Sequence, residues 1–169
     1  EYLALPELVV VGGGEYNSQF GPGTIDRELE VDDNMALMYF GAPKLVFVQG
    51  ETEVEDNDAL RPIQLGILVL TSKIDIEDNP ELTTVNLGAL KHVYPVGVDP
   101  PSPSVSFEND YRLTDLDLSS LISTAGDLSI VNTVLPCLYL PALEHVHYLP
   151  RPAWEGRCVC SENGEGFVV

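Results

Sequence analysis

The chain has 169 residues, a hydrophobic fraction of 44% and a formal net charge of −19, because 27 acidic residues stand against 8 basic ones. This length and apolar content are enough for a domain with a buried core and argue against a disordered acidic tail. The charge argues against nucleic acid and anionic membrane surfaces as partners, and no apolar run approaches the roughly 20 residues that span a bilayer. Cations, basic proteins and neutral surfaces remain as plausible partners.

A motif of about 22 residues recurs along the chain. It begins with two apolar residues around a polar one, followed by acidic residues and an asparagine, as in residues 74–79. The asparagines at 34, 57 and 79 are 23 and 22 residues apart (57 − 34 and 79 − 57). Apolar pairs at i and i+2 are typical of strands, and helix-length stretches without turn signals are scarce. The repeat predicts a mainly β solenoid with little helix.

In chain order, the sequence contains one partial repeat and five further repeats. Residues 3–11 match only the second half of the motif, so we expect part of another coil upstream. The fifth repeat is one residue short at its turn, where Asn132 stands near the asparagine position. The five repeats begin at Leu29, Thr52, Ile74, Val105 and Leu128.

Two insertions interrupt the repeats. Residues 12–28 are rich in Gly and residues 94–104 in Pro, so both are predicted to be inserted loops. They follow equivalent repeat positions and should emerge on the same side of the stack. We expect the solenoid to span 1–148, and residues 149–169 to form a C-terminal cap or the start of a following Cys-containing module.

Stacking explains why this repeat predicts a fold. A single coil cannot bury its apolar face, but stacked coils share one core, with equivalent residues in columns about 4.8 Å apart. The asparagines should be turn residues, because their side chains satisfy backbone groups and tolerate the left-handed conformation. The predicted core columns are Leu5, Ala42, Leu65, Leu87, Leu118 and Leu140; Leu8, Leu45, Leu68, Leu90, Leu121 and Leu143; and Val11, Val48, Thr71, Val93, Thr124 and Val146.

One pair of segments, Gly126-Asp127-Leu128-Ser129-Ile130 and Leu138-Tyr139-Leu140-Pro141-Ala142-Leu143-Glu144-His145-Val146, resembles the receptor L-domain superfamily. That superfamily includes the ligand-binding L domains of insulin- and EGF-type receptors and GPI-anchored cell-wall proteins of fungi. The resemblance covers about residues 1–148. It implies a right-handed parallel β-helix related to leucine-rich repeats, and an extracellular or cell-surface location.

Acidic residues recur at the end of the first strand of each repeat. Asp32, Glu55, Glu77 and Glu108 should form one column, and Asp33, Asp56 and Asp78 should lie in the next. Paired carboxylates on successive coils are a candidate calcium site, because Ca²⁺ takes several oxygen ligands. The alternative is a solvated acidic edge that maintains solubility.

The three cysteines are Cys137, Cys158 and Cys160. The last two are too close in sequence for an easy mutual disulfide, so we expect Cys137 to pair with one of them, as in an oxidising compartment. The remaining thiol has no partner within the chain.

The sequence favours a non-catalytic function. It contains no nucleophile elbow, phosphate loop or dinucleotide fingerprint, and its basic residues show no catalytic spacing. We expect an extracellular or cell-surface module of a larger protein, used for structural assembly or protein recognition through a protein partner or self-association. The loop aromatics Tyr16, Phe20 and Tyr94 are candidate contacts. The alternatives are a polysaccharide-active β-helix enzyme and an acidic calcium-binding module.

Overall fold

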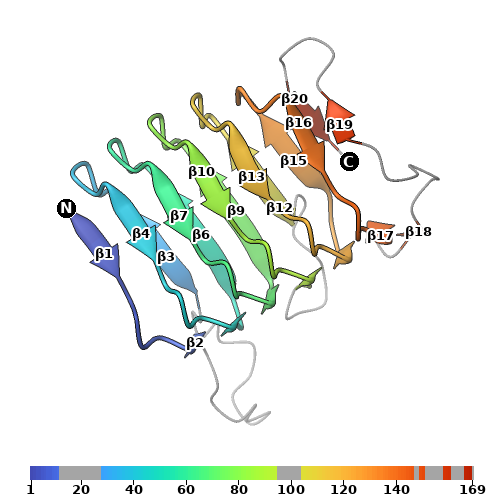
Figure 1. Cartoon of the computed structure of the whole chain (residues 1–169), viewed down its shortest axis with the longest axis horizontal. Coiled ribbons are helices and arrows are strands. Elements are labelled where there is room, and N and C mark those ends of the chain that lie inside the picture. Colours follow the sequence, from blue (N-terminus) through green and yellow to red (C-terminus); the bar gives the residue numbers. More distant parts are fainter. Residues whose placement is uncertain (12–27, 95–103, 147–148, 151–157, 161–165, 169) are drawn as a thin grey trace, which may run out of the picture.

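The computed structural model describes residues 1–11, 28–94, 104–146, 149–150, 158–160 and 166–168. These residues contain no helix; they form 20 short strands, most of which lie in three sheets that run along the molecule (Figure 1). A mainly β, solenoid-like fold was predicted and is confirmed. The two predicted loops lie largely outside the described residues.

Sheet A consists of five parallel strands, one from each successive coil. Its strands are β1 (Tyr2–Ala4), β4 (Tyr39–Gly41), β7 (Pro62–Gln64), β10 (Thr84–Asn86) and β13 (Asp115–Asp117).

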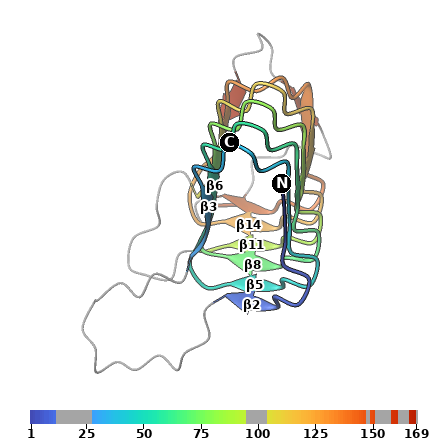
Figure 2. The ribbon, with the colours of Figure 1, turned by 90° about the vertical axis from the view of Figure 1, so that its left-hand side faces the viewer.

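Sheet B contains six parallel strands and one antiparallel strand, β18; the strands of this sheet that Figure 2 labels, β2 to β14, lie one above another. Its strands are β2 (Val10–Val11), β5 (Phe47–Val48), β8 (Leu70–Thr71), β11 (His92–Val93), β14 (Ser123–Thr124), β17 (His145–Val146) and β18 (Leu149–Pro150).

Sheet C contains five parallel strands and the antiparallel strand β20. Its strands are β3 (Leu29–Asp32), β6 (Glu51–Glu55), β9 (Lys73–Glu77), β12 (Val105–Glu108), β15 (Leu128–Val131) and β20 (Gly166–Val168). Two further strands, β16 (Cys137–Tyr139) and β19 (Cys158–Cys160), pair only with each other.

The core lies between the three sheets, and the three predicted columns are confirmed. Leu65, Leu87 and Leu118 are fully buried, as are Leu45 and Val48. Burying such a side chain contributes roughly 1.5–3 kcal/mol in transfer terms, so the columns are the main source of stability. The first-coil members Leu5, Leu8 and Val11 are only partly buried.

A buried ladder of side-chain amides joins the turns after sheet C. The Asn57 side chain donates to the carbonyls of Val31 (2.8 Å) and Glu55 (2.7 Å). The Asn57 backbone N–H donates to Asn79 Oδ1 at 3.3 Å, and the Asn79 N–H donates to Asp110 Oδ1 at 3.1 Å. The asparagines therefore satisfy backbone groups, as predicted.

The left-handed conformation belongs to the residue before each ladder position, which corrects the prediction for the asparagines of the column. Asn132 also takes this conformation, so Thr133, rather than Asn132, stands in register with Asp110. Asp and Asn tolerate a positive φ better than most residues because their short side chains bond locally. The left-handed residues are Asp33 (φ 54°), Asp56 (53°), Asp78 (54°), Asn109 (58°) and Asn132 (53°).

The two ends of the stack differ. At the C-terminal end, β20 pairs antiparallel with β15, β18 with β17 and β19 with β16, so the strands of the last coil are covered. At the N-terminal end, β1, β2 and β3 are the terminal strands of their sheets within the described residues. Within the described residues, no strand pairs with the outer edges of β1, β2 and β3, and the first-coil leucines are only partly buried.

Candidate functional site

The outward surface of sheet C carries an unusual density of carboxylates. Alternate residues of its strands face outward, and the register places Glu30 beside Glu53, and Glu53 beside Asp75. It also confirms the predicted acidic column from Asp32 to Glu108. We call the following residues the acidic face: Glu30, Asp32, Glu51, Glu53, Glu55, Asp75, Glu77 and Glu108.

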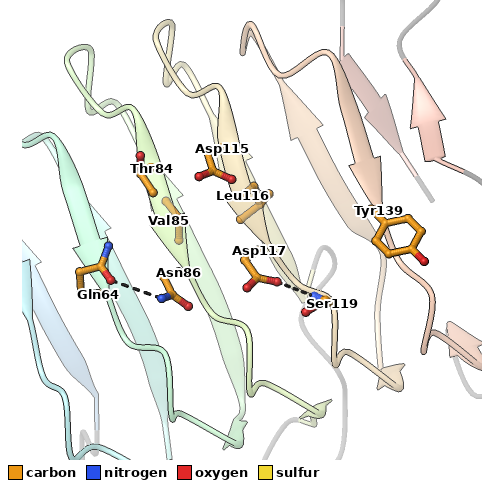
Figure 3. A pocket seen from close by; sticks show the side chains of 9 residues that line it. All are labelled: Gln64, Thr84, Val85, Asn86, Asp115, Leu116, Asp117, Ser119 and Tyr139. Carbon is orange, nitrogen blue, oxygen red and sulfur yellow. Dashed lines mark hydrogen bonds between the residues drawn. The ribbon is translucent and has the colours of Figure 1, made fainter.

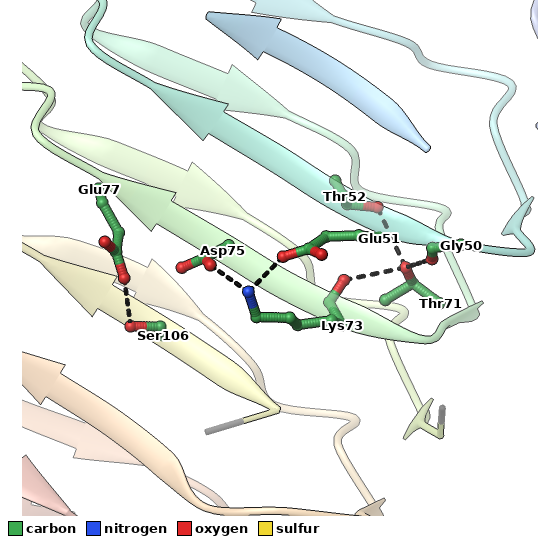
Figure 4. A network of polar contacts seen from close by, with 8 residues as sticks. All are labelled: Gly50, Glu51, Thr52, Thr71, Lys73, Asp75, Glu77 and Ser106. Carbon is green, nitrogen blue, oxygen red and sulfur yellow. Dashed lines mark hydrogen bonds and ion pairs between the residues drawn. The ribbon is translucent and has the colours of Figure 1, made fainter. Parts of the chain in front are cut away.

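One cation, Lys73, lies among these carboxylates on β3, β6, β9 and β12 (Figure 4). Its ammonium group forms ion pairs with Glu51 and Asp75. Burial alone would lower the pKa of Lys73, but the hydrogen bonds to Asp75 and Glu51 outweigh burial and raise it. Lys73 therefore stays charged, and its positive charge offsets the negative charges of Glu51 on β6 and Asp75 on β9.

The carboxylates away from Lys73 hold protons more tightly than usual. Burial, with the charges of Glu51 and Glu55, raises the pKa of Glu53 to about 7. Burial and Asp75 raise the pKa of Glu77 to about 7, against the lowering effect of the Ser106 hydroxyl, which donates to Glu77 Oε1 at 2.9 Å. Burial and the neighbouring carboxylates therefore keep Glu53 and Glu77 partly protonated near neutral pH.

A second feature is a shallow hollow of about 290 Å³ on sheet A (Figure 3). Outward residues of β7, β10 and β13 line it in register, and Tyr139 of β16 stands on the opposite side. We call it the sheet A groove; its polar lining side chains are Gln64, Thr84, Asn86, Asp115, Asp117, Ser119 and Tyr139.

The groove forms where the pairing of sheet A stops. β13 is the last strand of the sheet, and β16 of the next coil pairs with β19 instead. Leu116 of β13 is 8% exposed, whereas Ile63 and Val85 of the same column are fully buried. The gap between β13 and β16 therefore opens part of the core column as the floor of the groove.

The sequence prediction missed the sheet A groove. Gln64, Asn86 and Asp117 each stand directly before a leucine of one predicted core column. A comparison of repeats position by position would have found this polar column. The sheet A groove exists because β13 and β16 do not pair, and the repeat sequence does not indicate that this pairing is absent.

Among the predicted loop contacts, Tyr94 is the one that the structure describes. Its ring stacks on His92 at 5.5 Å between ring centroids, and its hydroxyl lies 2.6 Å from Ser123 Oγ. Tyr94 is therefore held against sheet B at the start of its loop. Tyr16 and Phe20 lie outside the described residues.

The candidate calcium ligands Asp33, Asp56 and Asp78 are the left-handed residues of the turns. Asp78 Oδ1 accepts a hydrogen bond of 2.9 Å from the Asn109 amide. In the part of the chain that the structure describes, no group of three or more His, Cys, Asp or Glu side chains is arranged to hold a metal ion. Calcium binding at these turns stays a prediction.

Cys137 is disulfide-bonded. The antiparallel pairing of β16 with β19 places Cys137 opposite Cys160, with Cys158 opposite Tyr139. The choice between the two candidate partners stays a prediction.

Comparisons with known proteins find no family model, curated protein or solved structure that matches this chain. Within the described residues, there is no helix with the length and apolar character needed to cross a bilayer.

Proposed function

We propose that this chain is a non-catalytic recognition module of an extracellular or cell-surface protein, and that its acidic face binds a basic protein partner. The resemblance of residues 1–148 to receptor L domains supports the location, as does the disulfide of Cys137, because disulfides persist in oxidising compartments. We also infer that the coils wind in the right-handed sense, because crossovers between parallel strands of one sheet are nearly always right-handed.

The observation that carries the proposal is the register of sheet C, which places Glu53 between Glu30 and Asp75, and Glu77 between Glu55 and Glu108. Burial, together with neighbouring carboxylates, raises the pKa of Glu53 and of Glu77 to about 7. Neighbouring carboxylates about 4.8 Å apart repel by somewhat under 1 kcal/mol per pair in water, and by more where water is scarce. Lysine or arginine side chains of a partner would remove this repulsion. Opposite charges also steer association and fix the register of the two surfaces.

A lysine decapeptide is a suitable first probe, with binding measured by fluorescence anisotropy at low and high salt. The double variant Glu53→Gln/Glu77→Gln should weaken binding about fivefold or more, because each charge contact at the surface contributes up to about 1 kcal/mol and these two carboxylates are partly buried. The matched control is Asp58→Asn/Glu144→Gln, which removes two carboxyl groups from exposed positions outside the acidic face. Both double variants are compared at pH 8.5, where Glu53 and Glu77 are mostly ionised. Equal weakening in both double variants would mean that only net charge matters, and the proposed site would be rejected.

A second candidate function, structural assembly, is favoured by the difference between the ends of the stack. The outer edges of β1, β2 and β3 have no partner strand within the described residues, so they present backbone groups that another strand can pair with. Light scattering over a concentration series should show self-association of the natural chain and a monomer for Tyr2→Lys/Val10→Lys, since both residues are exposed on end strands. A natural chain that stays monomeric at all concentrations would reject assembly through this end.

A further inference from the structure

The sheet A groove combines hydrogen-bonding side chains with an aromatic wall, on a different surface from the acidic face. We infer that it binds a neutral sugar ring through Asn86, Asp117 and Tyr139. This inference does not depend on the proposed partner of the acidic face.

The polar side of the groove is organised by internal hydrogen bonds. The Asn86 amide donates to Gln64 Oε1 at 3.3 Å and accepts from the Gly88 N–H at 3.2 Å. Asp117 Oδ1 accepts from the Ser119 N–H at 3.0 Å. These bonds hold the planes of the Asn86 amide and the Asp117 carboxylate, so that a ligand meets groups that are already oriented.

Groups for a ligand remain after these bonds are made. Within the described residues, the Gln64 amide nitrogen and the second carboxylate oxygen of Asp117 have no protein partner. Asp117 Oδ2 lies over Gly88, where an added Cβ would approach it to 2.5 Å. A glycine at this position therefore leaves room for the carboxylate to lie close to the sheet.

Tyr139 provides the apolar contact. It stands on β16, on the far side of the gap from β13, and 56% of its surface is exposed (Figure 3). An exposed aromatic ring offers a flat surface against which the C–H face of a sugar ring packs, while the hydroxyl group at its edge forms hydrogen bonds. The arrangement therefore matches the two-sided character of a sugar, which has apolar faces and a polar rim.

The mixture of donors and acceptors favours hydroxyl groups over a cation. A sugar hydroxyl accepts from an amide N–H and donates to a carboxylate, so it uses both kinds of group in the column. A lysine or arginine side chain only donates and would leave the Gln64 amide donors unused. A volume of about 290 Å³ lies at the lower limit of ligand pockets, which suits one ring rather than a larger molecule.

The test uses immobilised cellohexaose, laminarihexaose, chitohexaose and mannohexaose, followed by calorimetry with any sugar that retains the chain. Tyr139→Ala and Asn86→Ala should each weaken binding about tenfold or more, and Tyr139→Phe should preserve most of it because the ring remains. Tyr111→Ala is the matched control, since Tyr111 is 57% exposed but lies outside the groove. Thermal unfolding of each variant separates loss of binding from loss of fold.

Three results would overturn the inference. The first is that none of the four hexasaccharides retains the folded chain. The second is that binding survives both Tyr139→Ala and Asn86→Ala. The third is that a lysine tripeptide displaces the sugar from the groove. The variant Glu53→Gln/Glu77→Gln should bind the sugar normally, so failure at one surface is distinguishable from failure at the other.

Discussion

Asp110 stands in the buried ladder where Asn57 and Asn79 stand in earlier coils. The amides of Asn57 and Asn79 each donate to two backbone carbonyls, but a carboxylate has no proton to donate. Asp110 is fully buried, and its Oδ2 has no hydrogen-bond partner. Burial raises its pKa to about 8, with smaller contributions from Asp78 and Glu77, although the Asn79 hydrogen bonds lower it. A proton on this carboxyl group gives it a hydrogen to donate, as the amide groups of Asn57 and Asn79 have.

This arrangement makes the stability contribution of Asp110 depend on pH. The pKa is about 8 in the folded chain and 3.8 for the free side chain. The folded state therefore binds the proton more tightly, and the contribution is complete below about pH 4 and is lost as the pH rises toward 8. Proton binding by Asp110 favours the fold in acid rather than weakening it.

Asp110→Asn should raise the free energy of unfolding by about 1–3 kcal/mol at pH 8.5, because it replaces a buried acceptor that has no partner with an amide that can donate, as those of Asn57 and Asn79 do. At pH 4 the gain should be close to zero, since the natural side chain is already protonated in the folded state. Urea unfolding at several pH values measures both. Asp115→Asn, at an exposed strand position, is the control, and a gain that is equal at pH 4 and pH 8.5 would contradict this explanation.

At the scale of elements, sheet C depends on one lysine. The half-buried ammonium of Lys73 joins Glu51 of β6 to Asp75 of β9 and so links two neighbouring strands (Figure 4). Glu53 and Glu77 have raised pKa values near 7, so their effect on stability is lost as pH rises from about 4.5 toward 7. Repulsion within the acidic face therefore grows as the pH approaches 7, below the pH of about 8 at which Asp110 loses its proton.

Lys73→Met should destabilise the chain by about 1–3 kcal/mol at pH 7, since it keeps the side chain's apolar stem but leaves two half-buried carboxylates without a cation. Lys44→Met is the control, because Lys44 pairs with Glu7 on the exposed surface and should contribute less than about 1 kcal/mol. Urea unfolding at pH 7 compares the two. Similar losses of unfolding free energy for the two variants would show that the partial burial of the Lys73 ion pairs adds nothing to stability.

The coils also differ in how well they are packed. Leu65 is fully buried between coils on both sides, whereas Leu5 occupies the same column in the first coil and is only partly buried. Leu65→Ala should therefore cost about 2–5 kcal/mol, and Leu5→Ala less than half as much. Denaturant unfolding of the two variants makes the comparison. An equal cost would indicate that the first coil is covered in solution, as the assembly hypothesis requires.

At the scale of the whole molecule, the charge of −19 opposes compactness. Raising NaCl from about 20 mM to about 500 mM should increase the melting temperature by a few degrees, because salt screens the repulsion between exposed carboxylates. Scanning calorimetry measures this increase. A fall in melting temperature would show that the ion pairs of Lys73 outweigh the repulsion.

The same measurement separates general screening from the calcium prediction. Calcium and magnesium chloride at equal concentration screen charge equally, so the calcium site predicted at Asp33, Asp56 and Asp78 requires a larger increase with calcium. Equal increases with the two ions would reject that site.

The sequence by itself determined the solenoid and its core. Stacking places equivalent residues side by side, so a period read along the chain predicts neighbours in space, such as Leu65 beside Leu87. The left-handed turn residue was misplaced by one position, because both Asp and Asn suit that conformation and the local sequence does not distinguish them.

Only the tertiary structure decided the features that do not repeat. The pairing of β16 with β19, which opens the sheet A groove, joins segments outside the period. The pKa values of Asp110 and Glu53 depend on burial and on the charges around them. Neither quantity can be obtained from the positions of the acidic residues in the sequence. Contacts that repeat from coil to coil can be predicted from the period of the sequence. Contacts at the ends of the stack, and the charges that surround each side chain on its surface, depend on how the assembled coils lie in space.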